Sequence, residues 1–329
     1  MHNIVVLDIK TYQNKKYLFP GIFRLNIMIA AGRLCAGTYT LGRKLFTLFF
    51  LPFYFLVYPF KFWKIPKTKE FKYKLGLFVM AKNEGDYLEE WIKYHSHLGV
   101  DIFFVFDNES TDNTYQVLKP YIDQGIVIYR KIKGKGRHLD CYNMTINKYR
   151  KVCKYIGFID ADEFIYAKEG LNLKEEIDKA FASKNDIGGL VFNWLLFGSS
   201  HIEKKDERPV TQKFLYHSPQ DFEENYHVKG IVNPRLVMDY RNTHFAIYRK
   251  GYYAYSLSGN RVIGPFNTDL SNNDIRINHY FTRSKEEFIA KRNRGLSDQP
   301  GIRSLKEFEK FDRNEVYDDS MLRFGKIVK

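Results

Sequence analysis

The segment GFIDADEFIY, residues 157–166, places three carboxylates directly after an apolar run that is typical of a buried strand. The carboxylates belong to Asp160, Asp162 and Glu163. Such groups beside a buried strand cost free energy unless a cation or hydrogen-bond donors balance them. In an extended segment, side chains two residues apart point the same way, so Asp160 and Asp162 can share a hard divalent cation. We therefore expect a charged ligand at this point of the chain.

Alternating strand and helix patterns precede this segment. Apolar, strand-like runs occur at 75–80, 101–106, 126–132 and 155–159, and helix-like segments lie between them at 84–99, 114–123 and 138–151. This order predicts an α/β fold with a Rossmann-like, mostly parallel central sheet and helices on both faces. Ligands of such sheets bind outside the carboxyl ends of the strands.

A polar cluster follows each predicted strand, and the four clusters are AKNE (81–84), DNESTD (107–112), KGKGRH (133–138) and DADE (160–163). The four loops are expected to share one rim of the sheet. Asp107 and Asn108 can hydrogen-bond a base or ribose, although turn formation and helix capping explain them too. Lys135 and Arg137 can contact a phosphate or the edge of the base because the neighbouring glycines allow close approach, and a solvated basic loop is the alternative.

A cation held by the aspartates would bridge the oxygens of a diphosphate and stabilise the charge of a departing nucleoside diphosphate. The composition fits an ordinary globular chain, because 44% of the 329 residues are hydrophobic. Cys35, Cys141 and Cys153 show neither metal-ligand nor disulfide spacing. We expect them to be small buried side chains in a reducing compartment.

The positive charge is concentrated at the start of the chain. Residues 1–74 carry a net +11 of the total +14, and they include the uncharged run LFTLFFLPFYFLVYPF at 45–60. Sixteen helical residues reach only about 24 Å of the roughly 30 Å hydrocarbon layer, and Pro52 and Pro59 interrupt a helix. We expect residues 40–74 to attach to an anionic membrane surface; a buried hairpin or an oligomer contact is the alternative. The body is nearly neutral and matches no nucleic-acid module, so no nucleic-acid partner is expected.

Several ordered motifs resemble glycosyltransferase family 92. They are LFVMAKNEGDYLEEWIKYHSHLGV (77–100), FVFDNESTDNT (104–114), GFIDADEFI (157–165), NWLLFGSS (193–200) and INHYFTRSKEEFIAKRNRG (277–295). The nucleotide loop of the related glycosyltransferase family 2 reads D-x-x-S-x-D-x-T, which Asp107, Ser110, Asp112 and Thr114 match. The resemblance implies a GT-A catalytic domain over residues 74–300, flanked by the N-terminal segment 1–73 and a C-terminal tail, 301–329.

The resemblance also implies a metal-dependent, inverting transfer of a sugar from a UDP-sugar, such as UDP-galactose, with Mn²⁺ or Mg²⁺. Asp160 and Asp162 fall on the metal-binding DxD motif, with Asp160 also beside the nucleotide. The nucleoside-binding loop would comprise Asn83, Glu84, Asp107 and Asn108. A C-terminal histidine often completes the metal site; His279 is our first choice and His244 the second, and a structural role for His279 stays open. The helix residues Lys291, Arg292 and Arg294 would close over the diphosphate or form a solvated helix face.

An inverting transfer needs a base that removes the proton of the acceptor hydroxyl. We expect Glu207 to be this base, in an acceptor-side loop after NWLLFGSS. The other candidates are Glu203, Asp206, Glu223, Glu224 and Asp239. For each candidate, Glu207 included, a solvated surface charge is the alternative. Trp194 can stack on a sugar ring or belong to the core. Family members commonly have a glycine before the histidine of GSSHIEKK, so the acceptor loop departs from the pattern.

The sequence thus predicts a glycosyltransferase on the cytoplasmic face of a bacterial membrane, acting on a surface-polysaccharide glycan or a lipid-linked acceptor. One alternative is a nucleotidyltransferase, although AKNEGDY lacks the glycine-rich signature that such enzymes often show after the first strand. The other is a non-catalytic, membrane-attached module that binds a nucleotide or a glycan. The oligomeric state is not predicted.

Overall fold

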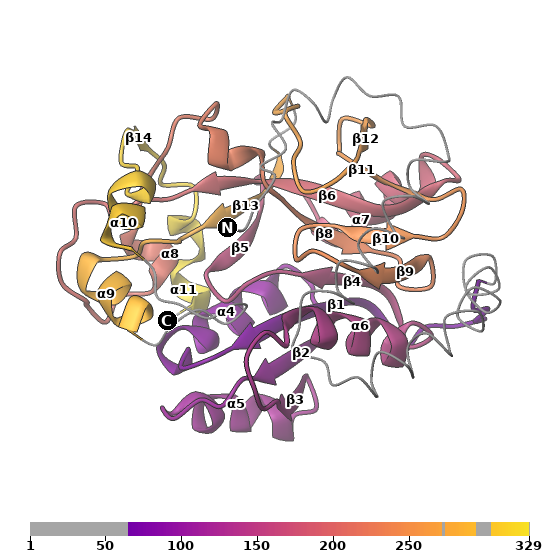
Figure 1. The fold of residues 1–329 in the computed structure, drawn as a ribbon, viewed down its shortest axis with the longest axis horizontal. Helices are drawn as coiled ribbons and strands as arrows, with labels where there is room; N and C mark the ends of the chain where they lie inside the picture. The colour runs from indigo at the N-terminus through magenta and orange to yellow at the C-terminus, as the bar shows by residue number, and fades with distance from the viewer. Residues whose placement is uncertain (1–64, 272–273, 294–303, 329) are drawn as a thin grey trace, which may run out of the picture. The chain divides into compact units, whose positions relative to one another are not determined.

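The computed structural model describes residues 65–271, 274–293 and 304–328. Every element described below belongs to the unit Lys61–Lys329 (Figure 1). Most of the predicted membrane-attaching segment, residues 40–64, lies outside the described residues. No helix within the described ranges has the length and apolar character needed to cross a membrane.

Four parallel strands form the first half of the central sheet. They are β1 (Tyr73–Ala81), β2 (Ile102–Asp107), β3 (Val127–Lys131) and β4 (Cys153–Phe158), and the chain connects them through α4 (Gly85–His97), α5 (Thr114–Asp123) and α6 (His138–Tyr149). β1 pairs in parallel with β2 and β4, and β2 pairs with β3. The predicted α/β fold with a mostly parallel sheet is confirmed.

The second half of the sheet mixes strand directions. It contains β6 (Ile187–Leu196), β8 (Val228–Val232), β11 (Tyr253–Tyr255) and β12 (Arg261–Val262), and the full strand order is β12-β11-β6-β8-β4-β1-β2-β3. β8 is antiparallel to both β4 and β6. β13 (Ile275–His279) runs parallel to β6 and antiparallel to β5 (Glu163–Ala167). The start of β8 therefore meets the ends of β4, β6 and β13 at one edge.

Helices cover both faces of the sheet, because β1 presents apolar side chains to each face. Leu77 and Val79 pack in one core cluster with Trp91 of α4 and with Ile177 of α7 (Leu173–Ala182). Phe78 packs in a second cluster with α6. α4 and α6 therefore lie on opposite faces of the sheet.

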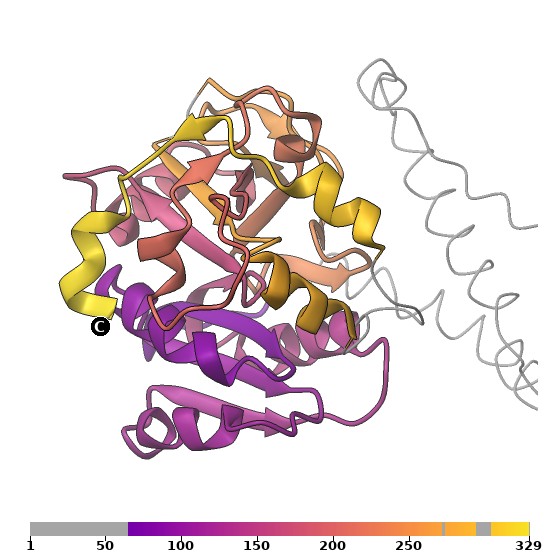
Figure 2. The same ribbon diagram turned by 90° about the vertical axis from the view of Figure 1, so that its left-hand side faces the viewer.

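The C-terminal residues pack against the body. They form α9 (Lys285–Asn293), α10 (Leu305–Phe311), β14 (Val316–Tyr317), η2 (Leu322–Phe324) and α11 (Gly325–Val328), shown in gold and yellow in Figure 2. β14 pairs with β7 (Tyr216–His217), and the Phe324 ring lies 5.0 Å from that of Tyr94. The remaining elements are α8 (Val210–Lys213), η1 (Glu223–Tyr226), β9 (Val237–Tyr240) and β10 (Ala246–Tyr248).

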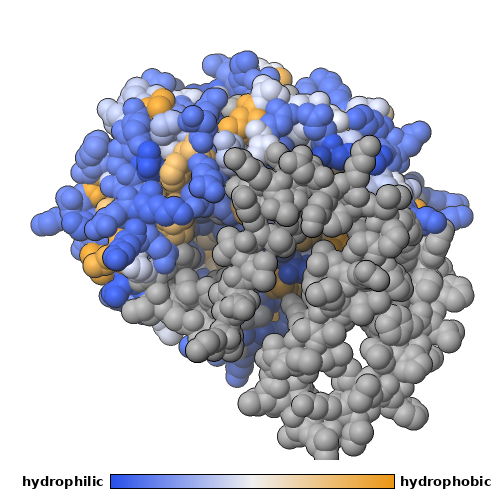
Figure 3. Space-filling view, turned by 45° about the horizontal axis from the view of Figure 1, so that its top comes forward, coloured by the Kyte–Doolittle hydropathy of each residue, from blue (hydrophilic) through white to orange (hydrophobic). Residues whose placement is uncertain are grey.

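Hydrophilic residues dominate the coloured surface in Figure 3, and hydrophobic ones are scattered over it. Cys141 and Cys153 are buried free thiols, as expected, and burial raises the pKa of Cys141 to about 11. Cys35 lies outside the described residues.

Candidate active site

Asp160 and Asp162 lie in a turn between β4 and β5, rather than in extended chain as the sequence suggested. The backbone N–H of Glu163 donates to the carbonyl oxygen of Asp160 at 3.1 Å. In return, the backbone N–H of Asp160 donates to Oε2 of Glu163 at 2.8 Å. These two hydrogen bonds close the turn and keep both aspartates at the carboxyl end of β4.

Asp162 lies beside His279, at the end of β13. The Nε2 atom of His279 is 3.6 Å from Oδ1 of Asp162, and the Lys291 ammonium of α9 contacts Oδ2. Burial alone would raise the pKa of Asp162, but Lys291 and His279 outweigh it and hold that pKa well below its usual value. Burial lowers the pKa of His279, although Asp162 opposes this. The histidine is therefore neutral at pH 7, which is the form that binds metal ions.

Asp160 is held by a buried lysine. Lys229 of β8 places its ammonium 2.7 Å from Oδ2 of Asp160 and 3.7 Å from Oε2 of Glu163. The Nε2 atom of His138, at the start of α6, lies 3.5 Å from Oδ1. Burial raises the pKa of Glu163 well above its usual value, with Lys229 acting against it. The ammonium group of Lys229 therefore places a fixed positive charge at the turn.

The side chains at this turn fit a divalent cation that binds together with a diphosphate. Within the described residues, no three His, Cys, Asp or Glu side chains could hold a metal ion among themselves. Asp162 and His279 form a pair, and magnesium-type sites commonly combine one or two carboxylates with substrate phosphates. Oδ1 of Asp160 and Nδ1 of His279 are buried and have no hydrogen-bond partner among the described residues. These atoms leave polar capacity for a ligand.

The loops after β1, β2 and β3 are tied together into one rim. Nδ2 of Asn108 donates to the carbonyl oxygens of Ile132 and Gly134 at 3.1 and 3.0 Å. Oδ1 of Asn83, whose φ of 53° is left-handed, accepts the backbone N–H of Thr111 at 2.7 Å. The loops meet as expected, and Asn108 joins the loop after β2 to the loop after β3.

Two further predicted nucleoside-loop residues are also fixed by protein partners. Oδ1 of Asp107 accepts the backbone N–H of Ser110 at 2.8 Å, and its Oδ2 accepts the Tyr129 hydroxyl. Glu84 is buried and accepts both terminal N–H groups of Arg283 at 3.2 Å. The Arg283 guanidinium also lies 3.5 Å from the centre of the Tyr87 ring. The rim is thus rigidly connected to the chain that follows β13.

The remaining predicted side chains are more exposed. Lys135 is exposed, and Arg137 donates to Oδ2 of Asp140 at 2.9 Å. Glu207 is exposed in the loop that precedes α8. Most of its alternatives form ion pairs, which are Glu203 with Lys285, Asp206 with Arg208, Asp239 with Arg241, and Glu224 with Lys310.

Trp194 of β6 lies at the centre of a histidine cluster. Its ring centre is 4.3 Å from that of His279, 4.8 Å from that of His227 and 5.2 Å from that of His244. Of the two histidines proposed as metal ligands, His279 is beside Asp162, and Nδ1 of His244 lies 3.1 Å from the Val228 carbonyl oxygen.

The sequence did not single out Lys229 or His227, and His138 stood only as the last residue of the KGKGRH cluster. A signal existed for Lys229, because it is the single charge in the otherwise apolar strand VKGIV. A buried charge needs a partner of opposite sign. No comparable signal marked His227.

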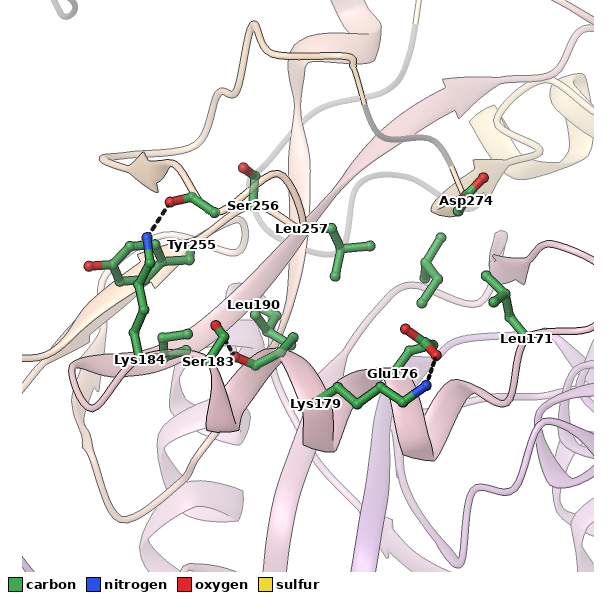
Figure 4. Close-up of a pocket in the computed structure, with 14 residues that line it drawn as sticks. Leu171, Glu176, Lys179, Ser183, Lys184, Leu190, Tyr255, Ser256, Leu257 and Asp274 are labelled. Carbon is green, nitrogen blue, oxygen red and sulfur yellow. Dashed lines mark hydrogen bonds and ion pairs between the residues drawn. The ribbon is translucent and has the colours of Figure 1, made fainter.

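A cavity of about 300 Å³ lies away from this site. Ile187 and Ile275, at the starts of β6 and β13, line it, so it is at the sheet edge opposite to His279. Its polar side chains bond to nearby protein groups (Figure 4): Lys179 to Glu176 at 2.7 Å, and Lys184 to the Gly259 carbonyl at 2.6 Å. We assign it no part in the site.

Several known proteins are similar to this chain. A family model described as Glycosyltransferase family 92 matches residues 79–307. A glycosyltransferase family 92 protein of Ricinus communis is 31% identical over 141 residues, which cover 42% of this chain and 25% of that protein. A galactan beta-1,4-galactosyltransferase of Arabidopsis thaliana, GALS2, is 34% identical over 89 residues, which cover 24% of this chain and 17% of that protein.

The chain spans about a quarter or less of the length of these curated relatives. Among solved structures, S. aureus TarS 1-349 in complex with UDP aligns with a TM-score of 0.34 at 15% identity. That similarity is limited to 50% of this chain and 47% of the other.

Proposed function

Because the chain belongs to glycosyltransferase family 92 and is a glycosyltransferase, we propose that it transfers a hexose from a UDP-sugar, with inversion, to a glycan or lipid-linked acceptor. The observation that carries the proposal is the Asp162–His279 pair, 3.6 Å apart, at the rim where the loops of the parallel strands meet. The relatives named galactan beta-1,4-galactosyltransferases support UDP-galactose as the donor and a β-1,4-galactan as the first acceptor to test.

In this proposal, Asp162 and His279 would hold a divalent cation, Mn²⁺ or Mg²⁺. When bound, such an ion neutralises the charge that develops on the departing diphosphate. Lys291 adds an ammonium group at the same point, and Lys229 keeps Asp160 fixed beside it. The rim of Asn83, Glu84, Asp107 and Asn108 would orient the nucleoside, with Lys135 and Arg137 next to its phosphates.

We also propose that the enzyme works at the cytoplasmic face of a bacterial membrane in the synthesis of a surface polysaccharide. The support is the net +11 of residues 1–74 and their uncharged run at 45–60. Sedimentation of the full chain with vesicles that contain phosphatidylglycerol tests this. Binding that weakens as salt is raised is expected, and a chain that stays soluble at every salt concentration contradicts it.

The enzymatic proposal is tested with the purified full chain and a panel of UDP-hexoses, with MnCl₂, MgCl₂ or EDTA. We expect UDP release from UDP-galactose with a divalent ion present, faster with β-1,4-galacto-oligosaccharides, and its loss in Asp162→Ala. Binding of UDP without turnover of any donor would favour the non-catalytic module. Release of pyrophosphate from UTP and a sugar 1-phosphate would favour the nucleotidyltransferase.

A further inference from the structure

His227 lies at the same edge of the sheet as the aspartate turn. It directly precedes β8, which runs antiparallel to β4, so the start of β8 is beside the end of β4. Lys229, two residues further on, reaches Asp160. Side chains two residues apart along extended chain share a face, so His227 points to the side of β8 that carries the Asp160 contact.

The hydrogen bonds of His227 determine its tautomer. Its Nδ1 atom lies 3.0 Å from the carbonyl oxygen of Glu224 and 3.4 Å from Oε2 of the same residue. Because a carbonyl oxygen only accepts, Nδ1 carries the hydrogen and Nε2 carries a lone pair. Nε2 bonds to no residue in the described part of the chain, and 22% of the side chain is exposed, so an acceptor can reach it.

Neighbouring rings hold the imidazole next to the candidate metal pair. The His227 ring stacks on Trp194 at 4.8 Å with an interplanar angle of 26°, and Phe266 packs edge-on at 4.6 Å. Trp194 in turn contacts His279, the neighbour of Asp162. The Trp194 ring therefore contacts both His227 and His279, one of the two residues proposed to hold the cation.

The electrostatic surroundings keep His227 neutral. Burial lowers its pKa, the positive charge of Lys229 lowers it further, and Glu224 opposes them. The other titratable group in contact is His244, with ring centres 5.2 Å apart. A neutral imidazole with a free Nε2 is a competent proton acceptor at pH 7.

We infer that His227 is the general base of the transfer and that Glu224 positions it; this rests on the proposed function. As the acceptor oxygen bonds to the anomeric carbon, its proton passes to Nε2. The bond from that carbon to UDP breaks, and its electron pair leaves with the diphosphate. Glu224 then stabilises the imidazolium through Nδ1–H. Glu207, the base predicted from sequence, is the competing candidate.

The test compares four variants of the full chain: His227→Gln, Glu224→Gln, Glu207→Gln and the control His97→Gln. His97 is an exposed histidine at the end of α4, which is the opposite edge of the sheet. UDP release from the best donor of the panel is measured with galacto-oligosaccharide and with water as acceptor. UDP affinity in MnCl₂ is measured by calorimetry.

We expect His227→Gln to lower kcat by about 10²- to 10⁴-fold for either acceptor, because glutamine cannot take the proton. Its UDP affinity should stay within about threefold of the wild type. Glu224→Gln should lower kcat and move the acid limb of the rate profile to lower pH, because Glu224 raises the pKa of His227. This second variant keeps the ring itself and therefore tests the pair even if His227→Gln folds poorly. His97→Gln should match the wild type.

The inference is overturned if His227→Gln keeps the kcat of the wild type. It is also overturned if Glu207→Gln lowers kcat by about 10²- to 10⁴-fold while His227→Gln does not. A parallel loss of UDP affinity in His227→Gln overturns it too, because the residue would then act on the donor. These results leave the proposed function standing. A wild-type chain that turns over no nucleotide sugar defeats the proposed function first, and the inference with it.

Discussion

The Lys229 ammonium lies 2.7 Å from Oδ2 of Asp160, and only 1% of the lysine side chain is exposed. The second aspartate of the turn, Asp162, has its own lysine in Lys291. The two carboxylates that follow a buried strand are thus balanced by two ammonium groups of the same chain. Because the buried pair is compensated before any ligand binds, the turn keeps its conformation in the unliganded protein.

Replacing Lys229 by methionine should destabilise the fold by about 1.5–3 kcal/mol at pH 7, because it removes the charged hydrogen-bond partner of the partly exposed Asp160 carboxylate. The double variant with Asp160→Asn should recover most of this loss. Urea unfolding gives the free energies. Lys168→Met is the control, since its pair with Asp274 is 62% exposed on the lysine side and is worth less than about 1 kcal/mol. Equal stability of the Lys229 and Lys168 variants would contradict the buried-pair interpretation.

Asp162→Asn should remove most of the gain in UDP affinity that Mn²⁺ provides. The amide keeps the size of the side chain and removes the charge that attracts the ion, so the affinity in MnCl₂ should fall at least about tenfold. UDP affinity measured in EDTA should change much less. Calorimetry in both buffers checks this, with Asp123→Asn on α5 as the matched control, since that carboxylate is 59% exposed. An unchanged Mn²⁺ effect would mean that other groups hold the ion.

The first half of the sheet could be predicted because its signals are local. The pattern of residues 114–123 predicted a helix, which is α5. Apolar runs bounded by polar loops predicted the strands β1 to β4. The site depends on contacts that are distant in sequence. His279 is beside Asp162 because β13 pairs with β5 in the register that sets His279 opposite Glu163. No local pattern states that register, so the preference for His279 over His244 came from the family resemblance and not from the register of the strands.

Lys229 and His227 illustrate the same limit. β8 inserts antiparallel between β4 and β6, although its five residues give no signal of strand direction or partner. That pairing places Lys229 and His227 at the end of β4, where the aspartate turn begins. The carboxylates considered as bases were chosen by residue type and by their position after NWLLFGSS, and the structure places several of them in ion pairs.

Stability should fall as the pH is lowered from 7.5 to 4.5, and His95 should contribute a full proton to that slope. Nδ1 of His95 donates to the Trp91 carbonyl at 2.8 Å, and Nε2 accepts the backbone N–H of Ile165 at 3.1 Å. Burial lowers the pKa of His95 from 6.5 to about 3. The unfolded chain therefore binds the proton first, so the stability is complete above pH 6.5 and is lost below it, by up to about 1.4 kcal/mol per pH unit.

Urea unfolding of the wild type and His95→Gln at several pH values checks this. Glutamine can donate and accept at the same two positions but does not titrate. The free energy of unfolding of the variant should depend less steeply on pH than that of the wild type, and the difference should correspond to about one proton. Identical slopes for the two proteins would show that His95 is not neutral in the fold.

Gly198→Ala should loosen the C-terminal residues from the body. A Cβ atom at Gly198 would lie 2.3 Å from the carbonyl oxygen of Arg313 and 2.5 Å from Oδ1 of Asn314. The first contact is with backbone, which cannot rotate away, so the chain around Arg313 must shift. That shift would strain the neighbouring hydrogen bond from the backbone N–H of Ser199 to Asp312, which is 2.6 Å long. We expect a loss of about 1–3 kcal/mol in the free energy of unfolding.

Limited proteolysis separates this local effect from general destabilisation. Cleavage of Gly198→Ala should begin between α10 and β14, while the segments that carry the parallel strands stay protected, because few contacts other than those near Gly198 hold residues 312–315. Ser199→Ala is the matched control, since it keeps the backbone N–H that bonds Asp312 and adds no atom near Arg313. A proteolysis pattern of Gly198→Ala identical to that of Ser199→Ala would show that the glycine does not determine how the C-terminal residues dock.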